Sequence, residues 1–255
     1  MASQELTQPT QQVLDPRRLG KSSSGLSDND TADVLLFLSG ATPAAIRIAQ
    51  NTADNAPHHV MYTDATGSYY GPSQDIEEQE TIIIDKNGKR QGRGTPEIAL
   101  RLSNASRLKS KSLMFVFGRN ASMSDIVLGT DSGRRISNQH FRIFINSEGL
   151  TMLEDMSTNG TIVDTNHLRG KDSRFDKCRM LVQGSDITVA SSSDDIIRFH
   201  VRFPARSSYV QIERFEENLQ AFMAECTAAD DTKRQRPFRA HSKWNGGEKY
   251  TIIGG

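Results

Sequence analysis

Residues 113–119 read Leu-Met-Phe-Val-Phe-Gly-Arg. This run of large apolar residues predicts a buried strand that ends at Gly118 and Arg119. Segments on either side also have strand character, and clusters of Asn, Gly, Ser and Asp separate them, as at residues 146–149. The strand-like segments are residues 98–102, 141–145, 150–154, 161–163, 187–189 and 196–203. Many short strands at regular spacing predict an all-β sandwich.

Two further clusters follow in order along the chain, each between a strand and a loop. Residues 137–140 read Ser-Asn-Gln-His, and residues 157–161 read Ser-Thr-Asn-Gly-Thr. Together with Gly118 and Arg119, these clusters resemble the signature of the forkhead-associated (FHA) domain. The match covers residues 113–165 at the level of motifs. It implies a phosphothreonine-peptide-binding domain over residues 96–205, with no catalytic machinery of its own.

The resemblance assigns roles to five side chains. A phosphothreonine carries about −1.5 to −2 charges and three strong acceptor oxygens, which suit the planar donor fork of an arginine. Arg119 is expected to fill that role. Ser137 is expected to donate its hydroxyl to a second phosphate oxygen, and Asn138 to add a backbone or side-chain donor. Asn159 is expected to clamp the main chain of the peptide, with Thr158 lining the same face.

Three residues are expected to support these loops: Gly118, His140 and Gly160. The histidine that matches His140 is structural in FHA domains, where it braces the loop holding the serine. A Ser-x-x-His pair also occurs in nucleophilic catalysis, but the sequence offers no orienting carboxylate or oxyanion site. Gly160 closes an Asn-Gly dipeptide, which also favours a tight turn.

Arg135 precedes Ser137 by two residues, at a position where FHA domains select the third residue after the phosphothreonine. The resemblance implies a preference for an acidic side chain there. An ordinary solvated loop arginine is an equally good interpretation of Arg135. The sequence does not decide between them.

Residues 1–32 are polar and predict a disordered tail. Ser3, Thr7 and Thr10 are each followed by Gln, as is Ser73. Kinases of the phosphatidylinositol-3-kinase-like family phosphorylate this dipeptide in DNA-damage signalling, so Ser3, Thr7 and Thr10 are candidate phosphorylation sites. A tail of this kind before an FHA domain resembles the regulatory region of fungal checkpoint effector kinases.

The remaining segments divide the chain further. Residues 33–95 are expected to form a small α/β appendage and loops, with a strand at 34–38 and a helix that Thr42 caps. Apolar residues recur at helical spacing after residue 206 and predict an amphipathic helix over 209–226. Residues 227–247 are expected to be a linker. Residues 248–255 resemble the first strand of a kinase domain, so the chain is expected to be truncated at Gly255.

Composition argues against several other kinds of ligand. Acidic and basic residues balance at 31 each, so no overall field attracts nucleic acid or a membrane, and no direct nucleic-acid partner is expected. Cys178 and Cys226 lack a metal-ligand spacing, so no metal is expected. No cofactor is expected either, and ATP and magnesium would enter only with a following kinase domain.

Partners are expected to be proteins that carry phosphothreonine, including the phosphorylated tail of another copy. The checkpoint resemblance and the basic residues 233–236 favour the nucleus, with the cytoplasm as the alternative. The main rival interpretation is a scaffold that binds its partner without phosphate, through apolar surface on the sandwich and on the helix at 209–226.

Overall fold

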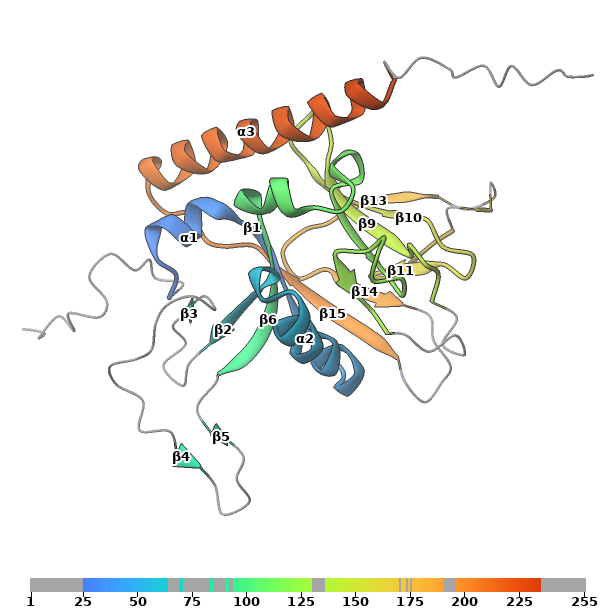
Figure 1. Cartoon of the computed structure of the whole chain (residues 1–255), viewed down its shortest axis with the longest axis horizontal. Helices are drawn as coiled ribbons and strands as arrows, with labels where there is room; N and C mark the ends of the chain where they lie inside the picture. The colour runs from blue at the N-terminus through green and yellow to red at the C-terminus, as the bar shows by residue number, and fades with distance from the viewer. Residues whose placement is uncertain are drawn as a thin grey trace, which may run out of the picture.

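The computed structural model describes residues 25–63, 69–70, 83–84, 90–91, 94–129, 136–169, 171–172, 174, 176–189 and 196–234. Two sheets share one hydrophobic core and form the expected sandwich (Figure 1). Within these residues the larger sheet has eight strands in the order β12-β11-β14-β15-β1-β6-β2-β3, and the smaller has five in the order β13-β10-β9-β7-β8. A pair of short strands, β4 (Ile83–Ile84) and β5 (Arg90–Gln91), stands apart from both sheets.

The bounds of the elements follow. The larger sheet contains β1 (Val34–Gly40), β2 (Val60–Thr63), β3 (Tyr69–Tyr70), β6 (Thr95–Arg101), β11 (Thr161–Val163), β12 (Asn166–Leu168), β14 (Asp186–Val189) and β15 (Ile197–Arg202). The smaller contains β7 (Phe115–Gly118), β8 (Ile126–Val127), β9 (Phe141–Ile145), β10 (Thr151–Asp155) and β13 (Cys178–Met180). The helices are α1 (Asp28–Asp33), α2 (Pro43–Asn55) and α3 (Tyr209–Arg234), with 3-10 turns η2 (Pro57–His59), η3 (Leu102–Arg107) and η4 (Lys111–Leu113).

Alternation along the strands places their apolar residues in the core. In β9, Phe141, Ile143 and Ile145 are buried and their neighbours are partly exposed. In β7, by contrast, every residue is buried, as the apolar run predicts. Phe117 of β7 stacks on Phe141 with ring centroids 4.5 Å apart, which ties two adjacent strands of the smaller sheet together.

The strand and the helix expected within residues 33–95 are present, and they are integrated into the sandwich. β1 lies between β15 and β6 in the larger sheet. Thr42 caps α2 as expected: its side-chain oxygen accepts a hydrogen bond from the Ala45 amide at 3.4 Å. A register shift between Val34 and Leu36 re-aims the side chains. Leu36 therefore faces the shared core while Phe37 packs on the other face of the sheet.

The C-terminal helix α3 lies across one end of the sandwich, close to α1 (Figure 1). It begins at Tyr209, as expected, and continues to Arg234, beyond the expected end at residue 226. Phe222 is buried and stacks on Phe115 of β7 with centroids 5.5 Å apart. Ile212 is one of the apolar residues at helical spacing, but it is exposed, because the helix reaches the core only farther along its length.

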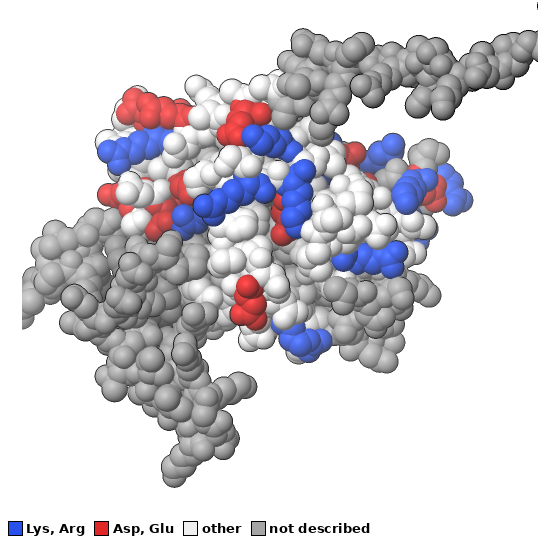
Figure 2. Space-filling model, viewed as in Figure 1, with Lys and Arg blue, Asp and Glu red and all other residues white. Residues whose placement is uncertain are grey.

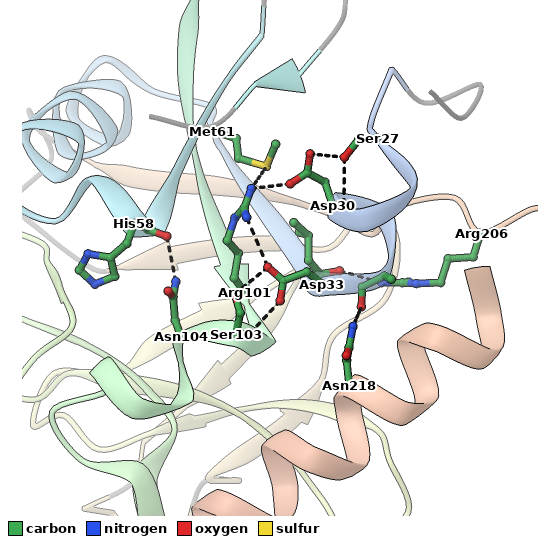
Figure 3. A network of polar contacts seen from close by, with 12 residues as sticks. Ser27, Asp30, Asp33, His58, Met61, Arg101, Ser103, Asn104, Arg206 and Asn218 are labelled. Atoms are coloured by element: carbon green, nitrogen blue, oxygen red, sulfur yellow. Dashed lines mark hydrogen bonds and ion pairs between the residues drawn. The ribbon is translucent and has the colours of Figure 1, made fainter. Parts of the chain in front are cut away.

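A polar network fastens α1, β6 and α3 together (Figure 3). The Arg101 guanidinium pairs with Asp30 at 2.7 Å and with Asp33 at 3.3 Å. Two backbone oxygens at the C-terminal end of α1 accept hydrogen bonds from α3 and from the segment that precedes it. Arg206 donates to the Val34 oxygen at 2.7 Å, and Asn218 donates to the Ala32 oxygen at 3.0 Å. We call Asp30, Asp33, Arg101, Arg206 and Asn218 the clasp. Acidic and basic side chains are interleaved over this region (Figure 2).

Among the described helices, none is long and apolar enough to cross a membrane.

Candidate functional site

Three loops meet at the end of the smaller sheet that lies away from α3. Phe117 pairs with Phe141 across β7 and β9, and Phe141 pairs with Asp155 across β9 and β10. This register brings together the loop that leaves β7, the loop that enters β9 and the loop that leaves β10. We call the described parts of these loops, residues 118–124, 136–140 and 156–160, the rim. All three sequence clusters lie on it, except Thr161, which is the first residue of β11.

Hydrogen bonds join Arg119, Ser137, Asn138 and Thr158 within the rim. The Arg119 amide donates to the Ser137 carbonyl at 3.0 Å, and the Arg119 Nε donates to the Asn138 Oδ1, also at 3.0 Å. The Thr158 amide donates to the Ser137 Oγ at 3.3 Å. Residues from three loops thus form one connected unit, with Arg119 half-buried and Thr158 exposed.

Gly118 makes this close approach sterically feasible. A Cβ at this position would lie 2.2 Å from the backbone oxygen of Asn138 and 2.7 Å from the Ser124 Oγ. Both distances are far below a normal contact. The Ser124 hydroxyl donates to the same Asn138 oxygen at 2.9 Å, so the loops cannot move apart without losing that bond. Glycine is therefore required here by packing.

His140 braces two of the three loops. Its Nδ1 accepts a hydrogen bond from the Ser137 amide at 3.1 Å, and its Nε2 lies 3.2 Å from the Gly160 carbonyl. Since an amide can only donate, the proton of the neutral ring sits on Nε2, which donates to Gly160. Burial lowers the pKa of His140, against the opposing effects of the Asp155 charge and the bond to Gly160.

This arrangement leaves His140 unsuited to act as a base toward Ser137. Both of its ring nitrogens are engaged by backbone groups, and the contact to Ser137 is made to the amide rather than to the hydroxyl. The hydrogen bonds support the bracing role that the resemblance implied. They give no support to nucleophilic catalysis.

Asp155 orders the third loop and had no recognisable signal in the sequence. Its buried carboxylate accepts hydrogen bonds from the Ser157 hydroxyl at 2.9 Å and from the Thr161 hydroxyl at 2.6 Å. The Ser157 hydroxyl in turn accepts from the Gly160 amide at 2.7 Å. Gly160 has φ +93, and a Cβ there would lie 2.5 Å from the His167 ring. The turn therefore needs glycine for both conformation and space.

Lys171 is a second residue that the motifs did not indicate. Thr161 pairs with Leu168 across β11 and β12, which returns the chain to the rim directly after β12. There the Lys171 Nζ donates to the Thr158 Oγ1 at 3.1 Å. The register of β11 and β12 brings this lysine to the rim, and the residue types alone do not reveal that register.

The other expected site residues stand as follows. Asn159 is half-buried within the third loop. Arg135, Ser3, Thr7 and Thr10 lie outside the described residues, as does the segment 248–255. In the described part of the chain, no three His, Cys, Asp or Glu side chains are grouped as a metal site would require.

Comparisons with known proteins give the same region a family. The family model described as "FHA domain" matches residues 115–190. The serine/threonine-protein kinase RAD53 of Saccharomyces cerevisiae (strain ATCC 204508 / S288c) is 31% identical over 117 residues, a match that spans 44% of this chain and 13% of that kinase.

Solved structures of Rad53 domains are also similar. The X-ray structure of the N-terminal FHA domain of S. cerevisiae Rad53p in complex with a phosphothreonine peptide is 33% identical, with a TM-score of 0.30, and the match covers 35% of this chain and 66% of that one. The refined NMR structure of the FHA1 domain of yeast Rad53 is 20% identical, with a TM-score of 0.37, over 74% of this chain and 84% of that one.

Proposed function

Residues 115–190 are an FHA domain, and on that premise we propose that this chain binds threonine-phosphorylated peptides through its rim. The observation that supports this most is the hydrogen-bonded unit of Arg119, Ser137, Asn138 and Thr158. This unit joins the permanent positive charge of Arg119 to the hydroxyl of Ser137. Asn138 and Thr158 lie beside them in the rim. A phosphate dianion needs such a combination of charge and directed donors.

The donors left over in the rim favour an anionic ligand. Arg119 uses its Nε on Asn138, and its two Nη groups make no hydrogen bond within the described residues. The Ser137 Oγ accepts from the Thr158 amide, which leaves the hydroxyl proton to donate elsewhere. A planar guanidinium edge and one hydroxyl therefore point to a ligand with several acceptor oxygens.

The remaining contacts belong to the same proposal. Asn138 has committed its Oδ1 to Arg119, so its Nδ2 group is the donor that a phosphate oxygen would use. Asn159 would hold the main chain of the peptide through its amide, which is both donor and acceptor. Arg135 would favour an acidic residue three positions after the phosphothreonine.

Calorimetry on a matched pair of peptides tests the proposal. A phosphothreonine peptide should bind, and the same sequence with an unmodified threonine should bind at least 100-fold more weakly, because the unmodified threonine lacks the charge that Arg119 meets. Equal affinity for the two forms would refute phosphate recognition. It would favour the alternative of a phosphate-independent scaffold.

We further propose that the chain is the regulatory part of a nuclear checkpoint serine/threonine kinase. The supports are the Ser-Gln and Thr-Gln dipeptides at Ser3, Thr7 and Thr10 and the partial similarity to a kinase. In this proposal damage signalling phosphorylates Thr7 or Thr10, and the rim of another copy or of an adaptor binds the result. ATP and magnesium are needed only by a catalytic domain beyond these residues.

Sedimentation of the phosphorylated and unphosphorylated chain separates the two partners. Dimers that form only after phosphorylation, and dissociate when a phosphothreonine peptide is added, support capture of the tail by a second copy. A monomer in both states excludes self-association and leaves the adaptor as the partner.

A further inference from the structure

We propose that Lys171 is the second cation of the phosphate site, binding the phosphothreonine dianion jointly with Arg119. This inference rests on the proposed function and adds a residue that the three sequence clusters do not contain. Its starting observation is that the Lys171 Nζ donates to Thr158, whose amide donates to Ser137. The ammonium is thus two hydrogen bonds away from the Ser137 hydroxyl.

The backbone around Lys171 is held in place from both sides. The pairing of Thr161 with Leu168 fixes the end of β12 next to the third loop of the rim. Just beyond it, the Arg169 amide donates to the Asp176 carbonyl at 3.1 Å, and the Asp172 amide donates to the Arg169 carbonyl at 3.2 Å. These bonds close a turn that carries Lys171 at the rim, so only its flexible side chain has to adjust to a ligand.

The charge of Lys171 is not taken up by the neighbouring carboxylate. Asp172 is engaged by Arg174, whose Nε lies 3.0 Å from Oδ1 and whose Nη2 lies 2.9 Å from Oδ2. Hydrogen bonds from Arg174 lower the pKa of Asp172 to about 2. Among the described residues, the one hydrogen bond of the Lys171 ammonium is to the neutral Thr158 hydroxyl. The Asp172–Arg174 pair therefore keeps a competing anion away from the ammonium.

Counting charges explains why a second cation is useful. A phosphothreonine carries about −1.5 to −2 charges at neutral pH, and Arg119 supplies a single positive charge. Lys171 brings the total to two. A site with two cations favours the phosphate dianion over the single charge of a glutamate or aspartate, which gives the rim a means to reject acidic mimics.

The experiment uses the full chain and a phosphothreonine peptide whose other side chains are uncharged. Titration calorimetry compares the parent chain with Lys171→Ala, Lys171→Arg and Lys177→Ala. Lys177 is the matched control because it is exposed in the same connection and carries the same charge. Lys171→Ala should weaken binding by about 5- to 30-fold, whereas Lys171→Arg and Lys177→Ala should stay within about threefold.

A second set of variants tests the role of the ion pair. Arg174→Ala releases Asp172 to compete for Lys171 and should weaken binding several-fold. Adding Asp172→Asn to Arg174→Ala should restore the affinity, although the double variant still lacks the Arg174 charge. Because the double variant has the net charge of the parent chain, a purely long-range effect of net charge predicts the same recovery. Arg174→Ala made in the Lys171→Ala chain separates the two: it should cause no further loss if Asp172 acts through Lys171, whereas a long-range charge effect would persist.

The outcomes separate this inference from the function on which it rests. If Lys171→Ala and Lys177→Ala weaken binding equally, or if neither does while Arg119→Ala abolishes it, the role of Lys171 is overturned and phosphate recognition stands. If the parent chain does not distinguish the phosphorylated peptide from the unmodified one, the proposed function itself fails. The inference is supported if Lys171→Ala weakens binding and Lys177→Ala does not, and if the loss caused by Arg174→Ala is absent in the Lys171→Ala chain.

Discussion

In the clasp the guanidinium of Arg101 contacts the carboxylates of Asp30 and Asp33, whereas in the rim the guanidinium of Arg119 contacts the amide oxygen of Asn138. The two regions lie at opposite ends of β7. Its first residue, Phe115, stacks on Phe222 of α3, and its last, Gly118, leads into Arg119.

The difference indicates what each cation does. A charge that is already paired with carboxylates holds elements together and attracts no further anion. A charge that meets only neutral oxygens keeps most of its potential for a ligand. Substitutions in the clasp should therefore affect stability, and substitutions in the rim should affect binding.

The largest effect on binding is expected from Arg119→Ala. Removing the guanidinium should weaken phosphopeptide binding by about 2–5 kcal/mol, because it deletes charge-assisted hydrogen bonds to the phosphate. The free energy of unfolding should change by no more than about 0.5 kcal/mol, since within the described part of the chain the Arg119 side chain makes one hydrogen bond, to an exposed amide. Calorimetry and urea unfolding measure the two quantities. A large loss of stability would place Arg119 with the clasp.

The reverse pattern is expected for Arg101→Leu. The paired side chains are mostly buried, with 20% exposure for Arg101 and 15% for Asp30, so the change leaves two carboxylates without their cation. We expect a loss of about 2–3 kcal/mol in the free energy of unfolding and an unchanged affinity for the phosphopeptide. Replacing Asp30 and Asp33 by Asn in the same chain should recover part of the loss.

Acid should destabilise the fold through His59, which lies near Phe115 at the end of β7 that faces α3. Burial, the largest cause, and the nearby charges of His58, Lys109 and Arg107 lower the pKa of His59 to about 3. The unfolded chain then binds a proton below pH 6.5 that the folded chain does not, so stability falls as the pH drops from 6.5 toward 3. Between pH 6.5 and 5 the loss should be about 2 kcal/mol.

Thermal unfolding across this pH range checks the expectation, with His59→Phe as the control. The variant keeps an aromatic ring against Phe115, whose ring centroid lies 6.3 Å from that of His59, and it removes the titrating group. It should lose less stability than the parent on acidification. Parallel pH profiles for the two chains would contradict the assignment to His59.

The smallest effect is expected from Ser137→Ala, which should weaken phosphopeptide binding by about 1 kcal/mol through the loss of one hydroxyl donor. Ser103→Ala is its counterpart in the network around the clasp, where the Ser103 hydroxyl donates to Asp33 at 2.8 Å. That change should leave affinity unaltered and lower stability slightly. Isothermal calorimetry and chemical unfolding of both variants make the comparison direct.

The sequence predicts the parts of this molecule that local patterns encode. Apolar alternation finds β9, and the three clusters find Gly118, Arg119, Ser137 and the loop ending at Gly160. The sequence does not predict the roles of Asp155 and Lys171, because their positions depend on strand register and on long-range packing rather than on neighbouring residue types.

The sequence does not predict that β1 is part of the sandwich, for a related reason. A short apolar run fits an edge appendage as well as a central strand, and the register shift at Leu35 is set by pairing with β6. The clasp joins Arg101 to residues about 70 positions earlier, which no local pattern reports. The roles of Arg135 and of the tail residues remain predictions.

The most direct test follows the side-chain ¹⁵N–¹H resonances of Arg119 and Arg101 while a phosphothreonine peptide is added. The guanidinium of Arg119, which contacts an amide oxygen rather than a carboxylate, should bind the phosphate, so the Arg119 signals should shift and those of Arg101 should stay in place. The unphosphorylated peptide should move neither. Arg119 signals that ignore the phosphopeptide, or Arg101 signals that respond equally, would contradict the division between rim and clasp.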